Sequence, residues 1–229
     1  MLDSNKNRSI KGNTPRNTFI LLNAGSGRRT KNYGNKCLIE YNGERIIDTQ
    51  IDSIIKAYTN KADIINVTGY LSEKLIRQTG NIRSVENVNY EQTNISESMR
   101  IGLNASLKGN VFFIHGDIAF SPSFIKPAGY NSISVPIDNK NRINKEEVGV
   151  VCSKGLITNF SYGLDKKWCQ IIFFPSSFFY KLRSVLSSID KSLTSFEVLN
   201  CLIEKGANIE YFESPRGKIK EIDSMKDTK

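Results

Sequence analysis

The stretch Thr18-Phe-Ile-Leu-Leu-Asn-Ala-Gly-Ser-Gly-Arg-Arg29 joins a short apolar run to a loop of glycine and arginine. The apolar half predicts a β-strand that is buried on both faces. In the loop, Gly25 and Gly27 let the backbone approach a ligand closely and offer N–H groups to phosphate oxygens. Ligands of open parallel sheets bind beyond the carboxyl ends of the strands, which is where this loop begins. The stretch therefore predicts an α/β fold with an anion-binding first turn.

Strands and helices alternate through the rest of the first half. The expected elements are a helix over 45–58, a strand over 62–68, a helix over 72–78 with Ser72 as its N-cap, a strand over 84–87, a helix over 95–107 and a strand over 110–117. Strands separated by helices at this spacing are typical of βαβ units, in which helices cover a parallel sheet.

The second half has a different pattern, with more strands and turn signals between them. Strands are expected over 132–137, 148–152, 156–161, 170–174 and 208–212, and helices over 176–186 and 194–204. Some of these strands are expected to be antiparallel because short turns connect them. The sequence contains no internal repeat, so we expect one α/β domain over residues 18–229.

The 229-residue chain carries 32 Lys and Arg against 23 Asp and Glu, a formal charge of +9. A basic balance favours polyanions or phosphorylated small molecules as partners. Residues 1–17 are polar and basic and lack the apolar segment of a secretory signal, so we expect a solvated tail there. No apolar run approaches the roughly 20 residues of a membrane-spanning helix.

The four cysteines are scattered through the sequence, and the chain has a single histidine, His115. A structural zinc site needs clustered cysteine and histidine ligands, which this spacing does not provide. Separate thiols in apolar surroundings suit a reducing compartment, so we expect a cytoplasmic protein. Because strand side chains alternate, His115 is expected to be packed rather than catalytic.

Three groups of residues could carry chemistry at the sheet edge. Arg28 and Lys36 add positive charge beside the glycine turn, which suits a polyphosphate. Asp117 ends the strand over 110–117, and Mg²⁺ prefers one or two carboxylates together with phosphate oxygens. Near the C-terminus, Glu221 and Asp223 alternate with isoleucines in a strand-like pattern. A dinucleotide fingerprint is absent because Thr30 stands where that motif needs glycine. A P-loop is absent because no Gly-Lys-Ser/Thr follows the turn.

Together these residues resemble the nucleotidyltransferases of GT-A-like fold, especially the small cytidylyltransferases that act on phosphocholine, 2-aminoethylphosphonate and related compounds. That family opens with A-G-x-G-x-R and a later P-K-x-L, which match residues 24–29 and 35–38, except that Asn35 replaces the proline and an arginine, Arg28, lies adjacent to Gly27. Its N-P-x-Y-x-x-T-N-x-x-x-S stretch matches residues 87–98, with Val88 in place of proline. Gly116-Asp117 and the E-I-D-x-x-x-D of residues 221–227 complete the set.

The resemblance implies a GT-A-like, Rossmann-related α/β fold with a mixed, mostly parallel sheet flanked by helices. Residues 18–120 would form the nucleotide-binding half, and residues 121–229 the smaller, mixed acceptor-binding half. The reaction implied is transfer of a nucleoside monophosphate, CMP from CTP, to a phosphorylated or phosphonate acceptor with release of pyrophosphate. The partners implied are these small molecules; no nucleic acid is expected, no insertion into a membrane, and a homodimer is one expected assembly.

The resemblance also implies roles for individual residues of this chain. The nucleotide would be held by Ala24, Gly25, Ser26, Gly27, Thr93, Asn94 and Ser98. Arg28 and Lys36 would be the catalytic cations on the triphosphate, while Asp117 and Asp223 would bind Mg²⁺. The helix expected from Ile95 would direct its N-terminal dipole at the nucleotide.

Three alternatives stay open from the sequence. One is a sugar-1-phosphate nucleotidyltransferase, and another is a glycosyltransferase of the same fold that consumes a nucleotide sugar. The third is a basic binding module without catalysis. An aromatic group in the second half, Tyr162, Trp168, Phe173, Phe174 and Tyr180, could enclose a quaternary ammonium by cation–π contact, but ordinary core packing is the favoured interpretation.

Overall fold

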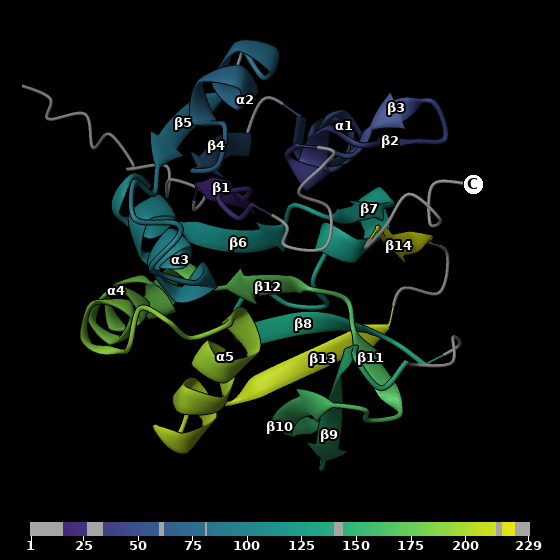
Figure 1. Cartoon of the computed structure of the whole chain (residues 1–229). Helices are drawn as coiled ribbons and strands as arrows, with labels where there is room; N and C mark the ends of the chain where they lie inside the picture. Colours follow the sequence, from purple (N-terminus) through teal and green to yellow (C-terminus); the bar gives the residue numbers. More distant parts are fainter. Residues whose placement is uncertain are drawn as a thin grey trace, which may run out of the picture.

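The computed structural model describes residues 16–26, 34–59, 62–80, 82–139, 144–213 and 217–222. Within these residues, ten strands form one sheet in the order β11-β9-β10-β13-β8-β12-β6-β1-β4-β5 (Figure 1). Two small two-stranded sheets accompany it, β14 with β7 and β2 with β3. The expected α/β class with a large mixed sheet is confirmed.

The first half of the chain supplies the parallel part of the sheet. β1 (Asn17–Leu22) lies between β4 (Ala62–Thr68) and β6 (Asn110–His115), and β5 (Arg83–Glu86) pairs with β4. All of these pairings are parallel. The carboxyl ends of the four strands therefore meet at one edge of the sheet, as the βαβ pattern predicts.

The second half is largely antiparallel, as its turn-rich sequence predicts. The strands concerned are β8 (Ile133–Asp138), β9 (Val148–Ser153), β10 (Leu156–Tyr162), β11 (Lys166–Trp168), β12 (Ile171–Phe174) and β13 (Ile209–Glu213). β12 pairs antiparallel with both β6 and β8 and so joins the two halves, whereas β13 is parallel to β8. β11 pairs with β9 and also with β8, which closes β8, β11, β9, β10 and β13 into a small ring.

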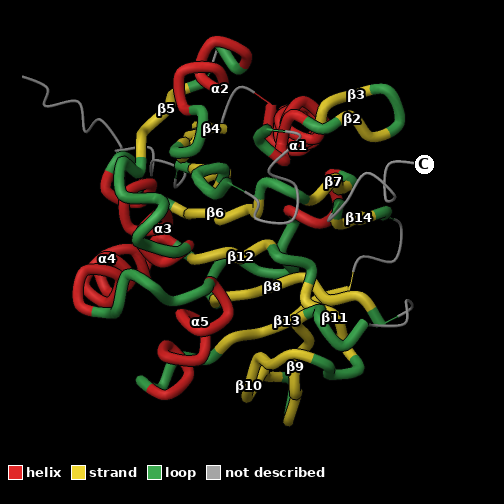
Figure 2. Tube along the Cα trace, in the orientation of Figure 1, coloured by secondary structure: helices red, strands yellow, loops and turns green. Residues whose placement is uncertain are grey.

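Helices cover both faces of the sheet (Figure 2). α1 (Ile46–Tyr58), α2 (Ser72–Gln78) and the 3₁₀ turn η4 (Pro122–Ile125) pack on one face, and α3 (Ile95–Asn104), α4 (Phe179–Ser188) and α5 (Ser195–Glu204) pack on the other. β1 shows why its whole apolar run is buried: Phe19 and Leu21 face α1, whereas Ile20 and Leu22 face α3. Strand side chains alternate between faces, so a strand covered on both sides has no solvent-facing positions.

Several short elements were not expected from the sequence. They are η2 (Lys36–Leu38), β2 (Glu40–Tyr41), β3 (Glu44–Arg45), β7 (Ile118–Phe120), η4 and β11. Runs of two to four residues carry too few positions to show a period. The helix expected over 176–186 begins as the 3₁₀ turn η5 (Ser176–Phe178) and continues as α4, and the strand-like pattern near the C-terminus forms β14 (Ile219–Glu221), the partner of β7. The expected N-cap at Ser72 is wrong. Leu71 precedes the helix in the left-handed conformation, and the Ser72 hydroxyl is hydrogen bonded to Thr68 Oγ1 at 2.8 Å.

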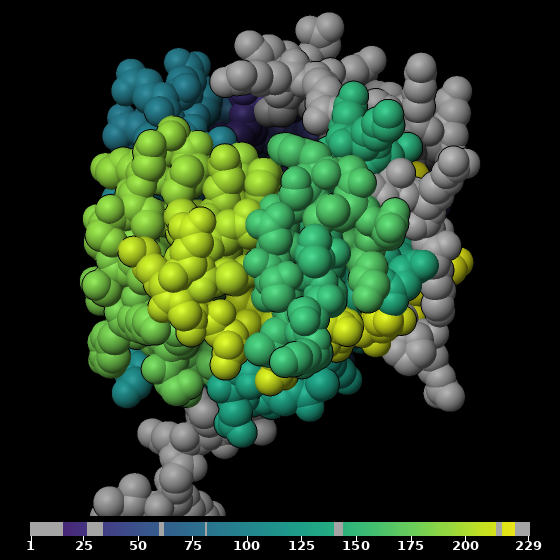
Figure 3. Space-filling view, turned by 90° about the horizontal axis from the view of Figure 1, so that it is seen from below, coloured from purple at the N-terminus to yellow at the C-terminus, as the bar shows by residue number. Residues whose placement is uncertain are grey.

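Seen from below, the surface of the molecule is formed mainly by the second half of the chain, coloured green to yellow (Figure 3). Among the described residues, no helix combines the length and the apolar character that crossing a membrane requires.

Candidate active site

A small pocket lies where β1 and β5 end. Its volume is about 70 Å³, and it is lined by Leu22, Ala24, Gly25, Asn87, Tyr90, Thr93, Asn94, Ile95 and Ser98. The turn after β4 is tied to the turn after β1, because the Tyr70 amide donates to the Ala24 carbonyl at 2.9 Å. Gly69 makes this approach possible, since a Cβ there would lie 2.6 Å from the Ala24 oxygen.

The N-terminus of α3 opens at this pocket. Asn94 is the N-cap, and its side-chain oxygen accepts a hydrogen bond from the Ile95 amide at 2.9 Å. Because the first amides of a helix have no partner within the helix, this end favours anionic groups. In the first turn, the buried Glu97 receives two hydrogen bonds of 2.7 Å from Arg100, which hold the pKa of its carboxyl below the usual value.

The loop from Asn87 to Asn94 is organised by one buried side chain. The Asn87 amide group donates to Thr93 Oγ1 at 3.1 Å and to Ser98 Oγ at 3.2 Å, and its oxygen accepts from the Asn89 amide at 3.1 Å. The bond to Asn89 closes an Asx-turn, which orders the loop although Val88 stands where the resembled family has proline. Sequence reasoning did not give Asn87 a role.

A second group of charges lies at the same sheet edge, next to the end of β6. The Nζ of Lys36 is 3.1 Å from Oδ2 of Asp117, and both side chains are about one-fifth exposed, 18% and 21%. The other carboxylate oxygen of Asp117 is buried and has no hydrogen-bond partner among the described residues. One oxygen is therefore neutralised, and the second is left for a cation or a donor.

Lys36 is held in place by its neighbour Asn35. The Asn35 side chain is buried and donates to the Tyr70 carbonyl at 2.6 Å. Its backbone φ of −69° is the angle that a proline would impose at this position. A hydrogen bond to the β4 turn thus restrains the loop where the resembled family has a proline ring.

The C-terminal strand reaches Asp117 from the other side. β14 pairs antiparallel with β7, which follows Asp117 directly, and the Ile222 amide donates to the Asp117 carbonyl at 2.8 Å. The Ile222 side chain is fully buried with Ile39 and Ile46. The described chain ends at Ile222, one residue before Asp223.

A buried charge cluster joins β14 to the second half of the sheet. Lys167 on β11 forms ion pairs with Glu147 and, at 2.9 Å, with Glu221, and the three side chains are 15–18% exposed. Burial alone would lower the pKa of the Lys167 ammonium, but the two carboxylates more than offset burial and raise the pKa. The spacing of Glu147, Lys167 and Glu221 in the sequence does not predict this cluster.

The structure brings most of the predicted site residues together. Ala24, Gly25, Thr93, Asn94 and Ser98 line the small pocket, and Lys36 pairs with Asp117. Ser26 lies next to Gly25 in the chain but does not line that pocket. Gly27, Arg28 and Asp223 lie outside the described residues.

The aromatic residues of the second half are mostly core. Trp168, Phe173 and Phe174 are at most 1% exposed, as the favoured interpretation expected, whereas Tyr162 and Tyr180 are more than half exposed. His115 packs edge-on against Trp168, and its Nε2 is 2.8 Å from the Ser195 hydroxyl. Its ring is therefore held by packing and by a hydrogen bond at the start of α5.

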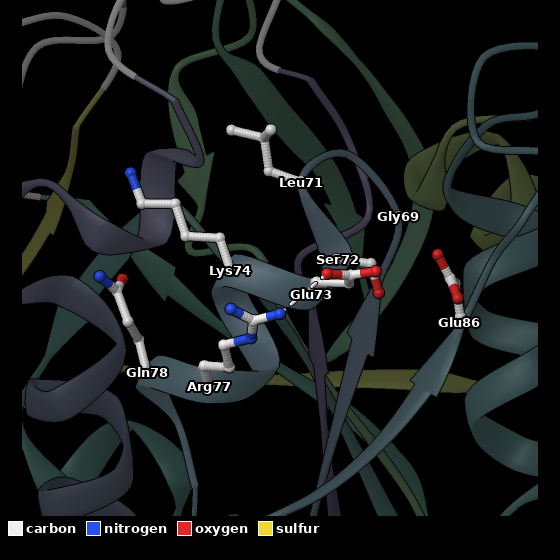
Figure 4. A pocket seen from close by; sticks show the side chains of 8 residues that line it. All are labelled: Gly69, Leu71, Ser72, Glu73, Lys74, Arg77, Gln78 and Glu86. Atoms are coloured by element: carbon white, nitrogen blue, oxygen red, sulfur yellow. Dashed lines mark hydrogen bonds and ion pairs between the residues drawn. The ribbon is translucent and has the colours of Figure 1, made fainter.

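A larger, open pocket of about 590 Å³ lies on the far side of Gly69, beside α2 and β5. Figure 4 shows its lining: Gly69, Leu71, Ser72, Glu73, Lys74, Arg77, Gln78 and Glu86. Glu73 and Arg77 pair with each other along one helix face at 3.1 Å and are both strongly exposed. The two pockets share no lining residue.

The chain is a nucleotidyltransferase, and one edge of its sheet carries a glycine turn, a helix N-terminus and a lysine beside a carboxylate. It belongs to the family described as the MobA-like NTP transferase domain, whose model matches residues 19–191. The match includes the small pocket, Lys36 and Asp117, and it ends before α5 and β14. A search of curated proteins gives no match.

Solved structures of nucleotidyltransferases share the fold. The inositol-1-phosphate CTP transferase from T. maritima superposes with a TM-score of 0.75 at 18% identity, covering 94% of this chain and 92% of that one. The CTP:phosphocholine cytidylyltransferase from Streptococcus pneumoniae gives 0.70 at 22% identity, covering 93% and 96%. A putative glucose-1-phosphate thymidylyltransferase from Bacillus anthracis gives 0.73 at 14% identity, covering 92% of each chain. At these identities the similarity establishes the fold.

Proposed function

We propose that the protein transfers CMP from CTP to a small phosphorylated or phosphonate acceptor and releases pyrophosphate. The observation that carries the proposal is the placement of the Lys36–Asp117 pair at the same sheet edge as the small pocket beside the glycine turn. That edge thus combines a recess with charges suited to a triphosphate. The two CTP-dependent enzymes among the structures of the same fold support the choice of CTP.

Each residue has a task in this proposal. Ala24 and Gly25 offer backbone groups to the base and ribose, with Thr93, Asn94 and Ser98 on the opposite wall of the pocket. Ser26 and Gly27 continue the turn towards the phosphates. Lys36 and Arg28 bind the triphosphate and stabilise the charge that builds on the leaving pyrophosphate.

A divalent cation fits the residues at Asp117. Its buried Oδ1 has no hydrogen-bond partner among the described residues, and carboxylate oxygen is the ligand that Mg²⁺ prefers. We propose Asp117 and Asp223 as the holding residues, because Asp223 directly follows Ile222, whose amide binds the Asp117 carbonyl. When bound, Mg²⁺ would neutralise phosphate charge during the transfer.

The proposed transfer needs no general base. An acceptor oxygen attacks the α-phosphorus, a new P–O bond forms, and the bond from the α-phosphorus to the oxygen that links it to the β-phosphorus breaks, so that this oxygen leaves with pyrophosphate. Because a phosphate nucleophile is already ionised at neutral pH, no side chain must remove a proton from it. The chain therefore has to position two anions and offset their repulsion, which is the work proposed for Lys36 and Arg28.

A sugar-1-phosphate is the second candidate acceptor. The thymidylyltransferase-like structure matches the fold as well as the CTP-dependent ones, with a TM-score of 0.73. The acceptor half contains polar groups at the same sheet edge, such as Asp138 at the end of β8, that could bind sugar hydroxyls.

We further propose a cytoplasmic location, since the four cysteines are free thiols. We also propose a homodimer, which a measurement of molecular mass in solution would test.

A pyrophosphate-release assay tests the function. The protein with Mg²⁺ would be given each of the four NTPs together with phosphocholine, 2-aminoethylphosphonate, inositol-1-phosphate or glucose-1-phosphate. We expect release with CTP and one of these acceptors, and its near-complete loss in Asp117→Asn. Asp52→Asn is the matched control, because Asp52 lies on α1 with an exposed carboxylate. Folded protein that releases no pyrophosphate with any pair would contradict the proposal.

A further inference from the structure

The orientation of the Asn87 amide is determined by a backbone group. Asn87 is 2% exposed, and its side chain meets the Asn89 amide on one side and two hydroxyls on the other. A backbone N–H can only donate, so the atom 3.1 Å from Asn89 N must be the Asn87 oxygen. The NH₂ group therefore faces Thr93 and Ser98, and it donates one hydrogen to each hydroxyl.

These contacts determine what Thr93 can offer to a ligand. Its hydroxyl lies 2.8 Å from the Asn89 carbonyl, which can only accept, so the single hydroxyl hydrogen of Thr93 is used there. The same oxygen accepts from Asn87 at 3.1 Å. One lone pair remains, and Thr93 can act towards the pocket only as an acceptor.

Ser98, in contrast to Thr93, can donate a hydrogen bond towards the pocket. Its oxygen accepts from Asn87 at 3.2 Å, and its hydrogen has no acceptor among the described residues. Ser98 is 4% exposed and lines the same pocket as Thr93. A buried hydroxyl whose hydrogen is unused is a donor for whatever fills the pocket.

We propose that Asn87 selects cytosine over uracil by fixing an acceptor at Thr93 and a donor at Ser98. The inference rests on the proposed function, because it names the base that this pocket takes. Cytosine places an amino donor next to a ring-nitrogen acceptor, a pair that matches the two hydroxyls. Uracil places a carbonyl acceptor next to an N–H donor, so it meets the wrong partner at both positions. Asn87 is thus a positioning residue that determines specificity through Thr93 and Ser98.

Reversing the polarity tests the proposal. In Asn87→Asp, the carboxylate has the shape of the amide but only accepts, so Ser98 would donate to it and turn its lone pairs to the pocket. We expect the ratio of the UTP to the CTP dissociation constant, measured by calorimetry with Mg²⁺ and no acceptor, to fall about tenfold or more. Asn159→Asp on the exposed side of β10 adds the same charge elsewhere and should leave the ratio unchanged.

Ser98→Ala provides a second measurement in case a carboxylate at position 87 prevents folding. Alanine suits a helix, and the change removes the donor, so CTP binding should weaken about tenfold while UTP binding stays the same or improves. A ratio that is unchanged in the folded variants would overturn the inference. So would wild-type protein that binds CTP and UTP equally, although nucleotide transfer itself would then stand. Wild-type protein that binds neither nucleotide would instead contradict the proposed function.

Discussion

The Nζ of Lys36 lies 3.1 Å from Oδ2 of Asp117, although 81 positions separate the two residues in the sequence. Each comes from an element that follows a strand of the parallel sheet, and the pair forms because those strands end at one edge. The arrangement puts a cation and an anion together at the same sheet edge as the pocket that we propose for the nucleotide. It gives the proposed phosphate chemistry a defined place in the molecule.

Removing the Lys36 charge should slow the transfer without unfolding the protein. We expect Lys36→Met to lower kcat by about 10²- to 10³-fold, as is usual for the loss of one preorganised electrostatic stabiliser. The measurement is pyrophosphate release at saturating nucleotide. Lys56→Met is the control, since Lys56 is a 70% exposed lysine on α1 paired with a carboxylate. Equal turnover in both variants would remove Lys36 from the site.

Gly116 should not tolerate a side chain while Asn23 is present. A Cβ at position 116 would lie 1.8 Å from Asn23 Oδ1 and 3.1 Å from the Leu22 carbonyl oxygen. We expect Gly116→Ala to lower the free energy of unfolding by about 1–3 kcal/mol, the usual cost of overpacking, and to displace Asp117.

The double variant Asn23→Ala/Gly116→Ala identifies the cause. It should recover part of the lost free energy of unfolding, because the Asn23 side chain, which lies nearer to the new Cβ than the Leu22 carbonyl does, is gone. Gly129→Ala is the control, since its Cβ would meet nothing within 4 Å and the change should be neutral. Urea denaturation of the wild type, Asn23→Ala, Gly116→Ala and the double variant gives the coupling free energy. Additive effects would show that the Asn23 contact is not responsible.

The Lys167 cluster should contribute to stability. Lys167→Met leaves Glu147 and Glu221 without their shared cation, and breaking a largely buried ion pair costs about 3 kcal/mol. Because the folded-state pKa of Lys167 is raised, its contribution is complete below roughly pH 10.5, its ordinary value, and disappears as the pH rises through the folded-state pKa. Denaturation at several pH values, with the exposed Lys205→Met as control, checks both points.

The cysteines should differ in reactivity. Burial raises the pKa of the Cys37 thiol to about 12 and also raises that of Cys169. Since the thiolate is the reactive form, neither residue should be alkylated in the native protein at neutral pH. Cys152 and Cys201 are partly exposed and should react first. Peptide mass spectrometry after brief alkylation tests this order, and early modification of Cys37 would contradict the packing around η2.

Much of the fold could be predicted because the buried strands carry long apolar runs. Phe19 to Leu22 face two helical layers, so four consecutive apolar residues suffice to identify a central strand. β7 could not be identified in this way, since it has only three residues, and the strand-like pattern of β14 does not reveal that β7 is its partner. The closure of β11 onto β8 depends on long-range pairing, which no local pattern reveals.

In the candidate site, too, local sequence patterns predict some residues, whereas the role of others depends on long-range contacts. Residues within recognisable motifs, such as Lys36, Asp117 and Thr93, were predicted, and the structure places Lys36 beside Asp117 and Thr93 in the small pocket. Asn87 lies within a recognisable motif, but the sequence does not reveal its role, because that role depends on the direction of its hydrogen bonds. Asn35 and Val88 differ from the resembled family only in replacing prolines. The hydrogen bonds that restrain these loops in place of the prolines involve Tyr70 and Asn89, and only the structure shows them.

The pairing of β14 with β7 has a consequence for the order in which the site is made. A ribosome that has released β7 must still synthesise the entire second half of the chain before β14 exists and can dock on it. Until then the hydrophobic recess around Ile39 and Ile46 lacks Ile222. A nascent chain can therefore complete most of its sheet and still lack the strand that docks beside Asp117.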